Sequence, residues 1–137
     1  MNDKKDFVIS KKCLQEYIGT DRDVVVPEGV EKIGGSAFSY DARLNSVSVP
    51  GSVTKLDEWT FNGCDALKSV VLHDGTLSIG DYAFKECISL EEIIIPESVK
   101  SIGVGAFMDS LSLIIHAPSG SYAERFAKEN GIPCEAI

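Results

Sequence analysis

A period of 23 residues runs through the middle of this sequence and restricts its fold more than any other feature. Four of the six phenylalanines share this step: Phe38, Phe61, Phe84 and Phe107. A column of aliphatic residues keeps the same step: Ile33, Leu56, Ile79 and Ile102. Prolines recur in phase, with a histidine in the third place: Pro27, Pro50, His73 and Pro96. Several independent columns with one period indicate a repeat protein whose stacked turns share a continuous core.

Each repeat has the same internal order. It starts with apolar residues at alternating positions, as in Val70 and Leu72, which predicts a short half-buried strand. A proline or His73 then ends the strand. The Ala-Phe-x-x-Cys segment that follows, as at 83–87, is too short for a full helix, so we expect a helical turn or a 3₁₀ segment there. The stacked repeats would place a parallel β-sheet on one face and these short helical turns on the other.

This pattern resembles the leucine-rich repeats of the BspA-like bacterial surface proteins. The match extends over about residues 24 to 118, and segment 90–103 (Leu-Glu-Glu-Ile-Ile-Ile-Pro-Glu-Ser-Val-Lys-Ser-Ile-Gly) follows the family pattern almost letter by letter. The resemblance implies an α/β, right-handed leucine-rich-repeat solenoid that acts in adhesion or protein interaction. It also implies a cell-surface or secreted protein, although the first residues lead into no long apolar run and we expect no signal peptide.

The chain length of 137 residues suits one domain. We expect an N-terminal cap over 1–23, four repeats over 24–113, and a last strand with a helical cap over 114–137. Loose alternation over residues 7–18 predicts a hairpin in the N-terminal cap, with a helix starting at Ser10 as the competing prediction. Ser121 and Glu124 form a capping box that predicts a C-terminal helix, and Asn130-Gly131 supplies its end.

The charge balance narrows the class of partner. Thirteen basic against twenty-one acidic residues give a formal net charge of -8. This charge argues against nucleic acid and against an anionic membrane surface, since both attract a positive protein. No apolar run approaches the length of a membrane-spanning helix. We therefore expect a protein partner and no membrane insertion.

Cysteine is the first candidate for chemistry. Cys64 and Cys87 occupy one column in adjacent turns, where they could form a disulfide, bind a metal or serve as a nucleophile. The sequence has no Cys-x-x-Cys motif and no histidine at ligand spacing, which favours buried free thiols and no metal site. Cys13 and Cys134 lie in opposite caps, too far apart to form a disulfide.

The remaining polar residues make no catalytic constellation. His73 and His116 lack the positioned nucleophile and orienting acid that a general base needs, and we expect His116 to face solvent on the last strand. Neighbouring carboxylates such as Glu91 and Glu92 point to opposite sides of a strand. We therefore expect a protein that is not an enzyme and has no cofactor.

The outward face of the parallel sheet is the candidate binding surface. If Val47 and Val49 face the core, Ser46 and Ser48 face outward. This register predicts one outward column: Val25, Ser48, Val71, Ile94 and His116. The neighbouring outward column is Asp23, Ser46, Ser69, Glu92 and Ile114. Val71 and Ile94 would leave an apolar strip of the kind that binds partners, although β-branched residues also favour strands for their own sake.

Trp59 and Tyr82 form a second candidate, because two aromatic residues one turn apart could contact a sugar or a protein or could simply pack over the core. The leading hypothesis is a non-catalytic protein-interaction or adhesion module that uses the sheet face. The first alternative is a self-associating structural module, for example a homodimer through the same face. A more remote alternative is an enzyme that uses Cys64 or Cys87.

Overall fold

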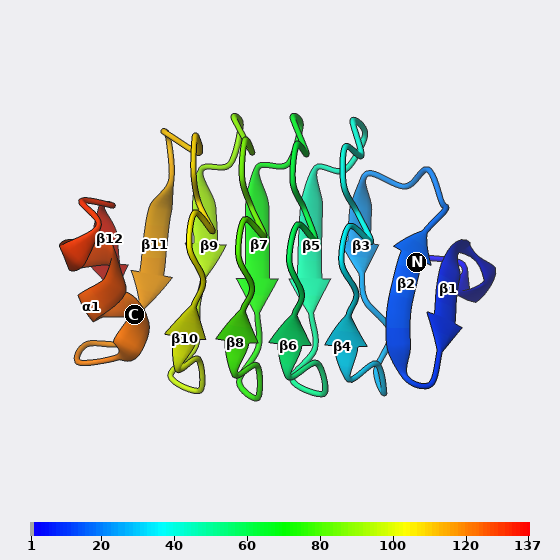
Figure 1. The fold of residues 1–137 in the computed structure, drawn as a ribbon, viewed down its shortest axis with the longest axis horizontal. Coiled ribbons are helices and arrows are strands. Elements are labelled where there is room, and N and C mark those ends of the chain that lie inside the picture. The colour runs from blue at the N-terminus through cyan, green and yellow to red at the C-terminus, as the bar shows by residue number, and fades with distance from the viewer. Residues whose placement is uncertain (1) are drawn as a thin grey trace.

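The structure is a computed structural model that describes residues 2–137 as a solenoid of about five turns (Figure 1). The turns stack along the long axis, with a hairpin at the N-terminal end and a helix at the C-terminal end. The expected solenoid fold is confirmed. It differs from the expectation in one respect, because two sheets instead of one run along the axis.

Both sheets have six strands, and every pair is parallel except the hairpin β1–β2. Sheet A contains, in spatial order, β1 (Phe7–Ser10), β2 (Cys13–Tyr17), β4 (Lys32–Ile33), β6 (Lys55–Leu56), β8 (Ser78–Ile79) and β10 (Ser101–Ile102). Sheet B contains β12 (Cys134–Ala136), β11 (Ile114–Ala117), β9 (Glu92–Ile94), β7 (Ser69–Leu72), β5 (Ser46–Val49) and β3 (Asp23–Val25). Each turn therefore contributes one strand to each sheet.

The third side of each turn is a loop made of consecutive reverse turns, where a helical turn or 3₁₀ segment was expected. In the first of these loops, the Ala37 N–H donates to Gly34 O at 3.2 Å, and the Asp41 N–H donates to Phe38 O at 3.2 Å. Ser36 and Tyr40, the third residues of these turns, have φ of 63° and 60°. Positive φ lies outside the right-handed helical region, so the chain cannot continue as a helix there.

The reverse turns direct backbone groups along the solenoid axis. Three N–H groups of each loop donate to carbonyls of the next, and we call this array the loop ladder. Its first rungs join Ser36 to Glu58 (3.3 Å), Phe38 to Thr60 (2.9 Å) and Tyr40 to Asn62 (2.8 Å). The following rungs join Trp59 to Asp81, Phe61 to Ala83, Gly63 to Lys85, Tyr82 to Val104, Phe84 to Ala106 and Glu86 to Met108. All rungs run in one direction, with the donor in the earlier turn.

The phenylalanine column forms the centre of the core. Rings of adjacent turns stack with centroid separations of 4.9, 5.0 and 5.4 Å between Phe38, Phe61, Phe84 and Phe107. Both caps continue this column. Tyr17 in β2 stacks on Phe38 at 5.4 Å, and Phe126 in the C-terminal helix contacts Phe107 at 6.2 Å. One row of aromatic rings thus passes from cap to cap.

The caps follow the sequence predictions with one addition. The hairpin prediction is confirmed, and the competing helix from Ser10 is wrong; a short 3₁₀ helix, η1 (Lys4–Asp6), precedes the hairpin. Helix α1 (Tyr122–Glu129) begins after Ser121, whose hydroxyl accepts the Glu124 N–H at 3.2 Å. The addition is β12, which pairs with β11 and was not expected.

Substitution of Phe61 with alanine tests the aromatic column. Phe61 is fully buried between two stacked rings, so we expect Phe61→Ala to lower the free energy of unfolding by about 3–5 kcal/mol. Urea denaturation followed by circular dichroism measures this change. Ile88→Ala, at a side chain that is 61% exposed, is the control and should change it by less than about 0.5 kcal/mol. Equal, small losses in both variants would contradict a core built on this column.

Candidate interaction surface on sheet B

The predicted register of sheet B is confirmed. Cα partners in neighbouring strands link Val25, Ser48, Val71, Ile94 and His116 in one column. The neighbouring column is also as expected: Asp23, Ser46, Ser69, Glu92 and Ile114. Val47, Val70 and Ile93, which alternate with the first column, are buried. The outward positions are therefore those that the sequence indicated, while their role in binding stays a prediction.

The outward columns contain a shallow hollow of about 200 Å³ at their C-terminal end. Val71, Ile94 and His116 line it together with Ile137, and Ser69 and Glu92 complete its wall. Sequence reasoning missed Ile137, which lies here because β12 pairs with β11 and the Ile137 N–H donates to Ala117 O at 3.1 Å. The hollow thus combines two turns of the solenoid with the C-terminal residue.

The apolar strip is shorter than the column that contains it. Val71 and Ile94 are half-buried neighbours, whereas Val25 is 62% exposed but lies two turns away from Val71. Ser48 separates them, and its hydroxyl shares a 3.0 Å hydrogen bond with His73 Nε2. Val25 therefore lies outside the hollow.

His116 is less exposed than expected for a residue facing solvent, since only 16% of its side chain is accessible. Its Nε2 lies 3.4 Å from Glu92 Oε1, and its Nδ1 lies 3.7 Å from Glu135 Oε1. Both carboxylates are largely exposed. The imidazole is therefore flanked by acidic groups, which give this end of sheet B a negative rim.

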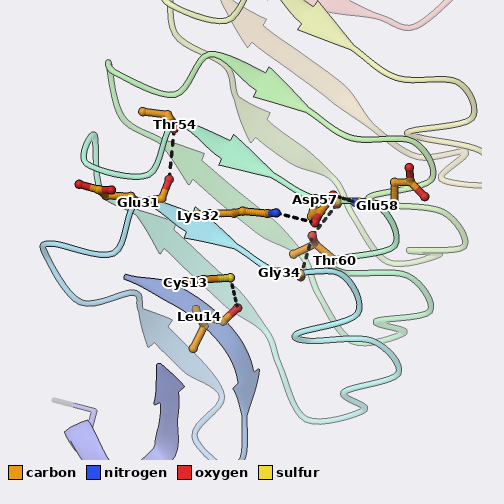
Figure 2. A network of polar contacts seen from close by, with 9 residues as sticks. All are labelled: Cys13, Leu14, Glu31, Lys32, Gly34, Thr54, Asp57, Glu58 and Thr60. Carbon is orange, nitrogen blue, oxygen red and sulfur yellow. Dashed lines mark hydrogen bonds and ion pairs between the residues drawn. The ribbon is translucent and has the colours of Figure 1, made fainter. Parts of the chain in front are cut away.

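Sheet A presents a polar outer column: Lys32, Lys55, Ser78 and Ser101. Figure 2 shows Lys32 Nζ directed at the carboxylate of Asp57, at 3.2 Å. Partial burial acts to raise the pKa of Asp57, but the Glu58 N–H and the Lys32 ammonium favour the carboxylate and lower the pKa overall. Sheet A is thus a charged face, and the apolar hollow belongs to sheet B.

Trp59 and Tyr82 stack on each other with ring centroids 4.5 Å apart, and Lys85 Nζ lies 5.5 Å and 5.9 Å from the two centroids. The ring of Tyr82 continues over Gly105 in the next turn, where any Cβ would collide with it. Both aromatic residues are half-buried. These contacts support a packing role over the loop side, and contact with a partner stays a prediction.

Cys64 and Cys87 are fully buried and act as hydrogen-bond donors. Their thiols donate to Phe38 O at 3.0 Å and to Phe61 O at 3.2 Å, and the Ser110 hydroxyl makes the equivalent bond to Phe84 O at 2.8 Å. Burial raises the pKa of both thiols, that of Cys87 to about 12. A thiol that remains protonated is a poor nucleophile, so this column serves packing and hydrogen bonding.

The four cysteines are free thiols. Within residues 2–137, no group of three or more His, Cys, Asp and Glu side chains is arranged to hold a metal ion. In the same residues, no helix has both the length and the apolar character that a membrane span requires.

The burial of the two core thiols leads to a labelling prediction. In native protein at pH 8, Cys64 and Cys87 should stay unmodified by iodoacetamide, while the half-buried Cys13 and Cys134 react first. All four should react in urea. Mass spectrometry of tryptic peptides assigns each modification. Native labelling of Cys64 or Cys87 as fast as that of Cys13 would contradict the buried arrangement.

Comparison with solved structures gives bacterial leucine-rich repeat proteins. A leucine-rich repeat protein from Bacteroides capillosus ATCC 29799 has a TM-score of 0.71 and 27% identity, with 82% of this chain and 93% of that chain covered. The T. pallidum leucine rich repeat protein TpLRR has a TM-score of 0.57 and 26% identity, with 84% and 70% covered. A leucine rich cell surface protein from Faecalibacterium prausnitzii A2-165 has a TM-score of 0.58 and 31% identity, with 84% and 37% covered.

A search of curated protein sequences finds no match to this chain. The family model for the BspA type leucine rich repeat region matches residues 8–122, in six copies. This match includes the N-terminal hairpin, all the repeats and the start of α1. The chain therefore belongs to the BspA-type leucine-rich repeat family.

Proposed function

We propose that this chain is a non-catalytic protein-interaction module whose partner binds the hollow on sheet B. The observation that carries the proposal is the meeting of Val71, Ile94 and Ile137 around one hollow on the outer side of the sheet. Exposed, contiguous apolar side chains rimmed by polar groups mark interaction sites on soluble proteins. Repeat proteins also commonly use their extended sheet surfaces for binding.

The dimensions and charge of the hollow indicate the chemistry of the partner. A volume of about 200 Å³ has room for one large apolar side chain, which would act as the anchor of the interface. Glu92 and Glu135 flank His116 at the rim, and the whole chain has a net charge of -8. Complementarity therefore favours a protein with an apolar anchor between basic residues.

An adhesive role at the cell surface is the biological form of this proposal. It is supported by the likeness to the Faecalibacterium prausnitzii protein, which is described as a cell surface protein. This chain spans 37% of that protein's length, so the role of the whole relative is not transferred. We propose surface adhesion as one use of the hollow on sheet B.

Self-association through the same face is the second candidate, because the apolar strip could be buried by a second copy. A two-fold dimer would bring the Glu92 and Glu135 rims of two copies close together. Repulsion between these carboxylates disfavours such a dimer relative to a basic partner. Light scattering during gel filtration separates the candidates: a dimer that Ile94→Lys converts to a monomer would favour self-association.

Ile94→Lys tests the proposed partner site. The probes are two fluorescent twelve-residue peptides with the same Leu-Phe-Leu centre, one with lysine flanks and one with glutamate flanks. Wild type should bind the lysine peptide at least about tenfold more tightly than the glutamate peptide, by fluorescence anisotropy. Ile94→Lys should weaken the binding of the lysine peptide by a similar factor, because it places a charge in the hollow.

Ile88→Lys is the matched control, since it adds the same charge at an exposed residue on the loop side. It should leave the affinity for the lysine peptide within about twofold of wild type. Both variants should melt within a few degrees of wild type, because both side chains face away from the core. Equal affinities for the two peptides, or equal effects of the two variants, would contradict the proposed site.

A further inference from the structure

The largest cavity of the molecule lies away from sheet B, between the last loop and the C-terminal cap. It is a groove of about 670 Å³. Its lining comes from residues 102–113 of the last turn, from Phe126 in α1 and from residues 130–133 after the helix. None of the lining residues carries a charge, although the chain as a whole is strongly acidic. We call it the terminal groove.

The wall of the terminal groove is the last step of the loop ladder. In the three preceding loops, the N–H groups at these positions all donate to the following turn. The equivalent groups of the last loop belong to Gly105, Phe107 and Asp109, and none of them has a hydrogen-bond partner among residues 2–137. Gly105 and Phe107 line the groove, and Asp109 continues the row. The ladder therefore ends in a row of unpaired donors.

The polarity of this row restricts what can occupy the groove. Because every rung runs from donor to acceptor toward the C-terminal end, the last loop offers N–H groups outward. A second copy placed symmetrically would set donors against donors, which excludes a two-fold dimer through this edge. The acceptor end of the ladder is occupied within the chain, because Ala37 O accepts the Tyr17 N–H at 3.1 Å. The occupant must therefore bring carbonyl acceptors from elsewhere.

We propose that the terminal groove binds an extended, uncharged peptide segment of another protein, whose backbone carbonyls continue the loop ladder. Alternate carbonyls of an extended peptide point to the same side and can accept from a row of N–H groups. Val104, Met108 and Leu111 are exposed by 69%, 43% and 92%, and they offer apolar contacts to its side chains. An acidic segment is excluded by Asp109 at the end of the row. This site is separate from the hollow on sheet B.

Leu111→Lys and Ile88→Lys form a matched pair for the test. Leu111 and Ile88 occupy the same place in successive turns, 23 residues apart, and both are exposed. Leu111 lines the terminal groove, whereas the loop of Ile88 is already paired with the next turn through Glu86 and Met108. A lysine at 111 introduces a desolvated charge into the groove, while a lysine at 88 adds the same charge outside it.

The probe is a displayed library of eight-residue peptides built from uncharged amino acids, selected on wild type and counter-selected on Leu111→Lys. We expect enriched peptides that bind Ile88→Lys as wild type does and bind Leu111→Lys at least about tenfold more weakly. In ¹⁵N-labelled protein they should shift the amide signals of Gly105, Phe107 and Asp109. Failure to enrich any peptide that distinguishes the two variants would overturn the proposal, as would shifts confined to sheet B.

Discussion

Contact between one turn and the next is the interaction on which the whole structure depends. Neighbouring strands in a sheet lie about 4.8 Å apart. The rings of Phe38, Phe61 and Phe84 stack at 4.9 and 5.0 Å, which is nearly the same distance. Identical residues can therefore stack in successive turns while the backbone ladders stay in register. This match explains why the aromatic column tolerates no change of step across the repeats.

The period of 23 residues was enough to predict the solenoid, the outward columns of sheet B and both caps. A shift of one residue would have turned Val70 and Ile93 outward, so the apolar alternation specifies the register strongly. Sheet A was missed because strands of two residues, such as Lys55–Leu56, are too short to show alternation. The reverse turns were missed because positive φ occurs at Trp59 and Tyr82, residue types that give no sign of it.

The candidate hollow shows the same division between periodic and non-periodic features. Val71 and Ile94 follow from the repeat, and so does the place of His116 beside them. Ile137 and Glu135 lie outside the repeat and reach the hollow only through the pairing of β12 with β11. No spacing in the sequence indicates that pairing, since it depends on how α1 returns the chain to the sheet. The end of a solenoid is therefore the part that a repeat pattern describes least well.

The loop ladder is directional, and its two ends differ in chemistry. At the N-terminal end the Tyr17 N–H caps a carbonyl of the first loop, whereas at the C-terminal end the N–H groups of the last loop have no partner within residues 2–137. Amide hydrogen exchange, resolved by NMR, tests this arrangement most directly. The account predicts that the amides of Phe38, Phe61 and Phe84 exchange at least about 100-fold more slowly than that of Phe107. Equal protection of all four amides would contradict it.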